Sequence, residues 1–170
     1  MSESAAMCES ATSTSDLLPT NFVGTAMAAV QNEDGKFRIY FQNKDYQIFE
    51  MSLNDPKSTV HTLLKLTTSG MPAARINTPI AAVACKDLRE IRVYYITVTS
   101  RVQEICHTQG KGWVKGATLG TAAENSSCLY AQQRNAHDLS IRVGFQCSTA
   151  PQTITEACYN EHQGWKNRVL

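Results

Sequence analysis

The sequence predicts an all-β protein made of three repeats of four short strands, arranged as blades of the β-propeller type. Short runs of aromatic and β-branched residues, bounded by Gly, Pro, Asn and Asp, are typical of strands and turns, and they occur in three groups of four. The groups recur at about 21–70, 78–122 and 127–170, and repeats of about 50 residues with four strands each are typical of propeller blades.

The first repeat is expected to form strands at 22–30, 37–42, 46–53 and 61–66. A tight turn at 43–45 separates the second strand from the third, and Pro56 ends the third because proline cannot donate to a strand ladder. The run at 61–66, HTLLKL, is the one segment with a helical look. Its six residues favour a short outer strand.

The second repeat is expected to form strands at 80–85, 91–96, 101–107 and 112–120, and the third at 128–133, 141–146, 154–159 and 164–170. No helix of useful length is predicted. Residues 1–18 are acidic and rich in Ser and Thr, so we expect a disordered lead there and a single three-blade domain at 19–170.

Three blades do not close a propeller. A blade buries its faces against its neighbours, so a three-blade arc leaves two apolar faces to be covered. A homodimer that completes a six-bladed ring, or the other half of a longer chain, would each cover them. We expect the homodimer.

Composition excludes several classes of function. Sixteen basic and fifteen acidic residues, with no basic run, argue against nucleic-acid and membrane partners. The N-terminal sequence lacks the basic and then apolar order of a secretory signal, which predicts a protein that is cytoplasmic or released without a signal peptide. The six cysteines form no CxxC pair and the four histidines have no metal-like spacing, so we expect free, buried thiols and no metal or other cofactor.

A spacing of Arg, Glu and Trp recurs in the three repeats. Arg92 is followed by Glu104 after twelve residues and by Trp113 after nine more. Arg38 and Glu50 are also twelve apart. In the third repeat Arg142 is followed by Glu156 at fourteen, and Trp165 again lies nine residues beyond the Glu.

Hairpin geometry gives these spacings a meaning. In an antiparallel hairpin, residues whose numbers add to a constant lie opposite each other, so turns centred on Lys44 and Val98 would place each Arg directly opposite its Glu. In the third repeat the two extra residues are expected in the turn, centred on Thr149, because an even insertion preserves the face. Directly opposed side chains project from the same face, about 4.5 to 5.5 Å apart at Cβ.

Two plainer interpretations compete with a binding site. A cross-strand ion pair on a solvated sheet is common and weakly stabilising, and the tryptophans could simply pack between blades. Threefold recurrence, twice with Trp at the same offset, favours a site. Arg supplies a fork of donors, a carboxylate supplies acceptors, and an indole supplies an apolar platform, which together suit a neutral sugar. A glycosidase would need two carboxylates at a defined separation, and each repeat offers one Glu.

These residues resemble the fungal fucose-specific lectins. The matching pieces are PTNF at 19–22 and the blade core AAV, IRVYY, VQE, GW and G across 81–116, which matches again, more loosely, at 141–165. The resemblance implies a six-bladed propeller with fucose sites between adjacent blades. Three departures suggest a half-length or diverged member: Ser58 and Thr59 where Gly-Trp is expected, Cys85 where Trp is usual, and a last blade ending five residues past its Trp.

The resemblance also implies how the sites are assembled, because in that family the Arg and Glu come from one blade and the aromatic from the next. Arg38 and Glu50 would then be completed by Trp113. Similarly, Arg92 and Glu104 would be completed by Trp165. Arg142 and Glu156 would be completed only by a partner molecule.

Three functions are therefore considered. The first is a lectin that recognises L-fucose-containing glycans, without enzymatic activity. The second is a lectin-fold enzyme that guides a cyclisation or pericyclic step in fungal natural-product biosynthesis, for which a shaped apolar pocket would suffice. The third is a structural relic that binds no sugar, and the three retained Arg and Glu pairs argue against it.

Overall fold

The computed structural model describes residues 17–19 and 25–170. Most of the predicted disordered lead, and all but the first residue of the PTNF segment, lie outside the described residues. Pro19 is described and buried.

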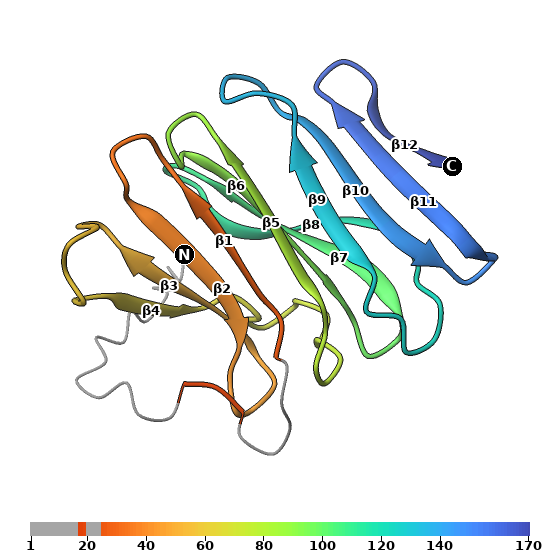
Figure 1. Cartoon of the computed structure of the whole chain (residues 1–170), viewed down its shortest axis with the longest axis horizontal. Coiled ribbons are helices and arrows are strands. Elements are labelled where there is room, and N and C mark those ends of the chain that lie inside the picture. Colours follow the sequence, from red (N-terminus) through yellow and green to blue (C-terminus); the bar gives the residue numbers. More distant parts are fainter. Residues whose placement is uncertain (1–16, 20–24) are drawn as a thin grey trace, which may run out of the picture.

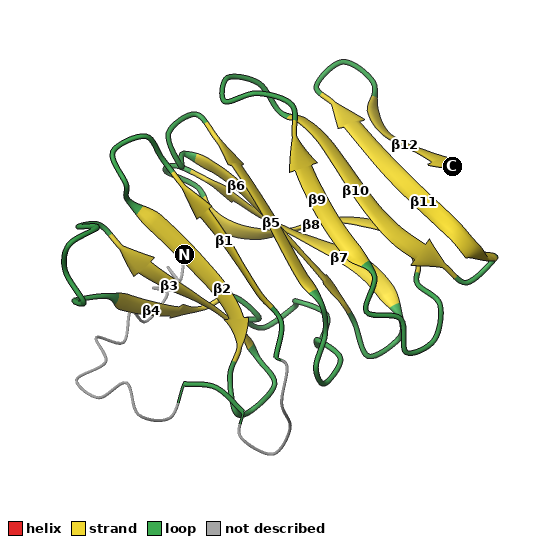
Figure 2. Ribbon diagram, in the orientation of Figure 1, coloured by secondary structure: helices red, strands yellow, loops and turns green. Residues whose placement is uncertain are grey.

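The described chain folds into three antiparallel sheets of four strands, each made of strands that follow one another in sequence (Figure 2). This confirms the predicted all-β fold of three blades. The part of the chain that the structure describes contains no helix, and hence none long and apolar enough to cross a membrane. The strands are β1 (Met27–Gln31), β2 (Phe37–Gln42), β3 (Ile48–Leu53) and β4 (Thr62–Lys65) in blade 1; β5 (Ile80–Cys85), β6 (Glu90–Ile96), β7 (Arg101–Thr108) and β8 (Gly112–Thr121) in blade 2; and β9 (Leu129–Gln133), β10 (Ser140–Cys147), β11 (Ala150–Asn160) and β12 (Gly164–Val169) in blade 3.

The blades stand side by side in chain order, with β1 and β9 on either side of β5 (Figure 1). Side chains on successive strand positions point to opposite faces, so each blade has a forward face toward the next blade and a rear face toward the previous one. The core between blades 1 and 2 and the core between blades 2 and 3 are separate apolar clusters. The first includes Tyr40, Ile48, Ile91, Val93, Tyr95 and Ile105; the second includes Tyr94, Ile96, Val102, Ile141, Val143 and Phe145.

The cysteines within the described residues are free thiols, as predicted. Cys85 is buried, whereas Cys106, Cys147 and Cys158 are half-buried and Cys128 is exposed. The expectation of uniformly buried thiols is therefore wrong for four of them. Cys8 lies outside the described residues.

The predicted hairpin register is wrong by two residues. In blade 2 Arg92 lies opposite Cys106, and Tyr94 is the residue opposite Glu104. The turn causes the difference: Thr97 donates its N–H to Arg101 O and its hydroxyl accepts the Arg101 N–H, which centres the turn one residue later than Val98. Because the side-chain period is two, the shift keeps Arg and Glu on one face, diagonal to each other.

The same shift occurs in blades 1 and 3. Arg38 lies opposite Ser52, and Arg142 lies opposite Cys158. In blade 3 the extra residues are not in the turn as predicted. Cys147 pairs with Ala150 across a short turn, and an irregularity in the ladder separates that pair from the next, between Phe145 and Thr155.

Candidate functional site

Each blade holds a buried glutamate on its third strand, and a tyrosine hydroxyl donates a hydrogen bond to it. The exposed fractions are 7% for Glu50, 5% for Glu104 and 3% for Glu156. The donors are Tyr40, Tyr94 and Tyr130, at 2.8, 3.0 and 3.1 Å respectively. Sequence reasoning missed these tyrosines, although Tyr40 and Tyr94 each stand two residues after the site arginine, where they share its face.

The tyrosine hydroxyls stay protonated at neutral pH. Burial, and then the adjacent charge of Glu50, raises the pKa of Tyr40 far above its usual value. Burial and Glu104 do the same for the pKa of Tyr94. Each hydroxyl therefore acts as a fixed donor that orients the carboxylate.

The first site comprises Arg38, Glu50 and Trp113, and the structure brings Trp113 of blade 2 against blade 1. Trp113 packs edge-on against Tyr40, with ring centroids 5.9 Å apart, and Tyr40 in turn binds Glu50. Glu50 also accepts the Ser52 hydroxyl at 3.0 Å. The Arg38 guanidinium donates to Phe37 O at 2.9 Å, and no ion pair of the described residues joins it to Glu50.

The second site comprises Arg92, Glu104 and Trp165, in the same cross-blade arrangement. Trp165 of blade 3 packs edge-on against Tyr94, with centroids 6.3 Å apart. Arg92 Nε lies 3.9 Å from Glu104 Oε1, and Arg92 Nη1 lies 3.0 Å from Glu90 Oε2. Arg92 is thus held between two carboxylates.

Gly116 opens the space for the Glu104 carboxylate. A Cβ at this glycine would lie 2.3 Å from Glu104 Oε2 and 2.6 Å from Cys106 Sγ. The next residue, Ala117, donates its N–H to Glu104 Oε2 at 3.0 Å. A side chain at position 116 would therefore displace the carboxylate that this N–H binds.

The third set, Arg142 and Glu156, is built differently, because a second arginine occupies the carboxylate. Arg168 of β12 reaches Glu156 Oε2 with Nε at 2.7 Å and Nη2 at 2.5 Å, while Arg142 Nη1 is 3.8 Å from Oε1. Burial opposes ionisation of Glu156, but hydrogen bonds from Arg168, Cys158 and Tyr130 outweigh it and hold the pKa of this carboxyl below its usual value. No tryptophan ring contact completes this set within the described residues.

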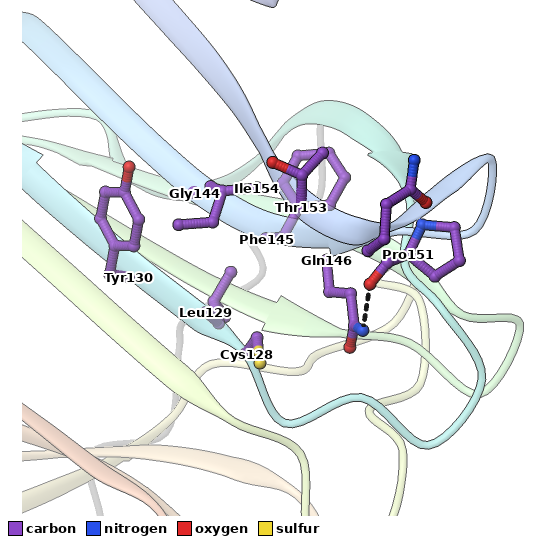
Figure 3. A pocket seen from close by; sticks show the side chains of 10 residues that line it. Cys128, Leu129, Tyr130, Gly144, Phe145, Gln146, Pro151, Thr153 and Ile154 are labelled. Carbon is purple, nitrogen blue, oxygen red and sulfur yellow. Dashed lines mark hydrogen bonds between the residues drawn. The ribbon is translucent and has the colours of Figure 1, made fainter. Parts of the chain in front are cut away.

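In blade 3 the tyrosine that binds the glutamate lies on the first strand of the blade instead of the second. Tyr40 and Tyr94 pair with alanines on β1 and β5, whereas Tyr130 on β9 pairs with Gly144 on β10. Figure 3 shows Tyr130 and Gly144 on one wall of a hollow of about 360 Å³ on the forward face. A Cβ at Gly144 would lie 1.9 Å from Tyr130 Cε1, so the exchange of large and small residues preserves the bond to Glu156.

The three carboxylates differ in the acceptor positions they have left. An ionised carboxylate has about four lone-pair positions. In Glu50 and in Glu104, each of the two carboxylate oxygens accepts one hydrogen bond. Glu156 Oε2 alone receives two bonds from Arg168 and one from Cys158. The first two glutamates can therefore accept further hydroxyls on both oxygens, whereas Glu156 can do so only on Oε1, which accepts from Tyr130.

Comparison with known proteins gives one family. A family model described as fungal fucose-specific lectin matches residues 22–169. A fucose-specific lectin of Aspergillus oryzae is 32% identical over 145 residues, which are 84% of this chain and 44% of that protein. The chain thus spans less than half the length of this relative.

Solved structures agree in fold. The crystal structure of AofleA from Arthrobotrys oligospora matches with a TM-score of 0.69 at 24% identity, over 85% of this chain and 42% of that one. The Aleuria aurantia lectin, described as a six-bladed β-propeller with a novel fucose recognition mode, matches with a TM-score of 0.64 at 23% identity, over 85% of this chain and 48% of that one.

Proposed function

Because this chain belongs to the family of fungal fucose-specific lectins, we propose that it binds L-fucose in fucosylated glycans at the first and second sites defined above. One observation carries the proposal. In both sites a tryptophan of one blade packs on the tyrosine that binds the glutamate of the preceding blade. The carboxylate and the indole are therefore held next to each other by a packed inter-blade contact.

The chemistry of the sites suits a neutral deoxy sugar. The guanidinium donates to ring or hydroxyl oxygens, the glutamate accepts from hydroxyls at its free lone-pair positions, and the indole covers the apolar side of the sugar. Fixed partners hold these groups in advance, since Tyr94 and Ala117 orient Glu104. Such preorganisation lowers the ordering cost of binding.

Catalysis is not favoured. The relatives are named as lectins, and the third-strand glutamate of each site is already bound by a tyrosine. The lectin-fold enzyme considered from the sequence has no specific observation in its support.

Closure of the ring by a second copy remains a prediction. In such a dimer the forward face of blade 3 would meet the rear face of blade 1 of the other chain, and Arg142 and Glu156 would face that blade. Light scattering at micromolar concentration tests this, and a monodisperse monomer would contradict it. Gln132 and Arg142 lie exposed on the forward face of blade 3, so we expect a weaker contact there than in the two apolar cores within the chain.

Titration calorimetry with methyl-α-L-fucoside tests the proposed function. We expect two sites per chain, and D-mannose at the same concentration as a control should give no heat of binding. Absence of fucoside binding to folded protein would overturn the proposal.

A further inference from the structure

The first and second sites differ in the residue that stands beside the site arginine. In blade 2, Glu90 lies two residues before Arg92 and binds it at 3.0 Å. The matching residue of blade 1 is Lys36, which lies two residues before Arg38 and opposite Asn32 at the end of the β1–β2 ladder. Register places each of these residues on the same face as its arginine. The first site therefore has a lysine where the second has a carboxylate.

The position beyond the site tryptophan differs in the same direction. Lys115 lies two residues after Trp113 and pairs with Ile105, whose side chain belongs to the core between blades 1 and 2. The Lys115 side chain therefore projects from the rear face of blade 2, toward the first site. At the second site the same position of blade 3 is Asn167, whose amide donates to Leu119 O of blade 2 at 2.8 Å. A cation at the first site thus replaces a neutral amide at the second.

The cations of the first site have no carboxylate partner. No ion pair of the described residues involves Lys36, Arg38 or Lys115, and both lysines are exposed. Arg92, by contrast, is bound to Glu90 and its side chain is only 12% exposed. The first site can therefore bind an anion from solution without breaking an ion pair.

Other charged groups at the two blade interfaces do not reverse this difference. Asp87 of blade 2 accepts a hydrogen bond from Asn32 Nδ2 at 2.7 Å across the first interface. Burial lowers the pKa of His107, so its ring adds no charge there at neutral pH. At the second interface Lys86 is paired with Glu161 at 3.7 Å. The charged groups are Lys36, Arg38 and Lys115 against Glu50 and Asp87 at the first site, and Lys86 and Arg92 against Glu90, Glu104 and Glu161 at the second. The first site therefore has an excess of positive charge, and the second an excess of negative charge.

We infer that the first site prefers fucose in an acidic glycan, with a carboxylate or a sulfate close to the fucose, and that the second site prefers the neutral glycan. The inference rests on the proposed function, because it concerns the group that accompanies the fucose. Lys36 and Lys115 attract the anionic group at the first site, whereas Glu90 repels it at the second. Both sites lie between consecutive blades of this chain, so the difference is independent of how the ring is closed.

Titration calorimetry with matched probes tests the inference. The probes are the Lewis X trisaccharide and its forms sialylated or sulfated on the galactose, which add a carboxylate or a sulfate beside the fucose. The measured quantity is the Kd of Lewis X divided by the Kd of the acidic form. Trp165→Ala isolates the first site, and Trp113→Ala isolates the second. We expect a ratio of about five or more at the first site and of about one or less at the second.

The probes also separate the inference from the function on which it rests. The tighter of the two acidic forms identifies carboxylate or sulfate as the preferred group. Equal ratios at the two sites would overturn the inference and leave the proposed function standing. Absence of Lewis X binding to folded wild-type protein would overturn both.

Two exchanges between the sites locate the preference. Lys36→Glu gives blade 1 the residue of blade 2 and should lower the ratio at the first site by about fivefold, while Lys115→Asn gives blade 2 the residue of blade 3 and should lower it by about twofold to threefold. Lys44→Glu makes the same change of charge in the exposed turn at the other end of β2, and as the matched control it should change the ratio by less than about twofold. Equal falls in Lys36→Glu and Lys44→Glu would mean that the acidic probes sense net charge only, which overturns the inference.

The wild-type chain provides the test if either tryptophan variant does not fold. Lys36→Glu in that chain should then weaken the acidic form at one of its two sites. Unchanged affinity for the acidic form at both sites would overturn the inference.

Discussion

Replacing Trp113 with alanine should remove one fucose site and leave the other intact. The indole belongs to blade 2, but it packs on Tyr40 of blade 1, and Tyr40 holds Glu50. The second site uses Trp165 and Tyr94 in its place. Trp165→Ala is therefore a matched variant, with the same chemical change at the other site.

The stability cost can be worked out from the contacts. Trp113 is half-buried against the core between blades 1 and 2, and its ring also lies 5.2 Å from that of His107. An aromatic pair contributes about 0.5–1.5 kcal/mol beyond its buried area, and a buried Trp→Ala change costs about 3–5 kcal/mol. For a half-buried ring we expect a cost of about 2–4 kcal/mol, below the typical 5–15 kcal/mol of a folded domain. The melting temperature should fall by roughly 4–16 °C, with the protein still folded at 25 °C.

Calorimetry with methyl-α-L-fucoside should show the stoichiometry falling from two sites to one in either single variant, and to none in the double variant. Retention of both sites in Trp113→Ala would refute the cross-blade assignment. If Trp113→Ala does not fold at 25 °C, Trp113→Phe keeps an apolar ring and separates the two roles. A folded Phe variant with both sites at wild-type affinity would make position 113 a packing position only.

Two further predictions concern the arginines. Arg168→Ala should make the stability of the protein depend less on pH. Arg168 helps to hold the pKa of Glu156 below its usual value in the folded protein. The stabilisation from the ionised Glu156 carboxylate is therefore present above about pH 4.5 and is lost as pH falls through the folded pKa. Urea unfolding at pH 7 and pH 3.5 should show a smaller difference for the variant than for the wild type, and an unchanged difference would contradict the role of Arg168. Arg92→Ala should weaken fucoside binding at its own site by about 2–4 kcal/mol, more than Glu50→Gln does at the other site, because it removes the donors and the cation that faces Glu90 and Glu104. Equal affinity losses in calorimetry would contradict this.

The blades could be predicted from the sequence because the signals for strands and turns are local. The runs at 91–96 and 101–107 and the turn between them contain the residue types that form a hairpin, and the structure confirms them as β6 and β7. The register could not be predicted, since it depends on whether Thr97 closes the turn with its own hydroxyl. The error of two residues preserved the face, which is why Arg92 and Glu104 still share a site.

The parts of the sites that escaped prediction involve compensation between strands. Tyr130 replaces a tyrosine that the other blades carry on the second strand, and its role depends on Gly144 across the ladder. Arg168 reaches Glu156 from the outermost strand. Neither residue repeats the spacing found in the other blades, so a search for recurring residues could not find them.

The differences between blades gather on the forward face of blade 3, and packing explains why they are tolerated there. Val30 and Val83, which pair with the site arginines of blades 1 and 2, pack against the apolar cores toward the following blade. A charged or amide side chain at either position would be buried without partners, at a cost of about 1–3 kcal/mol. The corresponding Gln132 is exposed, and in the part of the chain that the structure describes no blade covers it. Packing of a following blade therefore keeps the position opposite the site arginine apolar in blades 1 and 2, whereas Gln132 makes the same position of blade 3 polar.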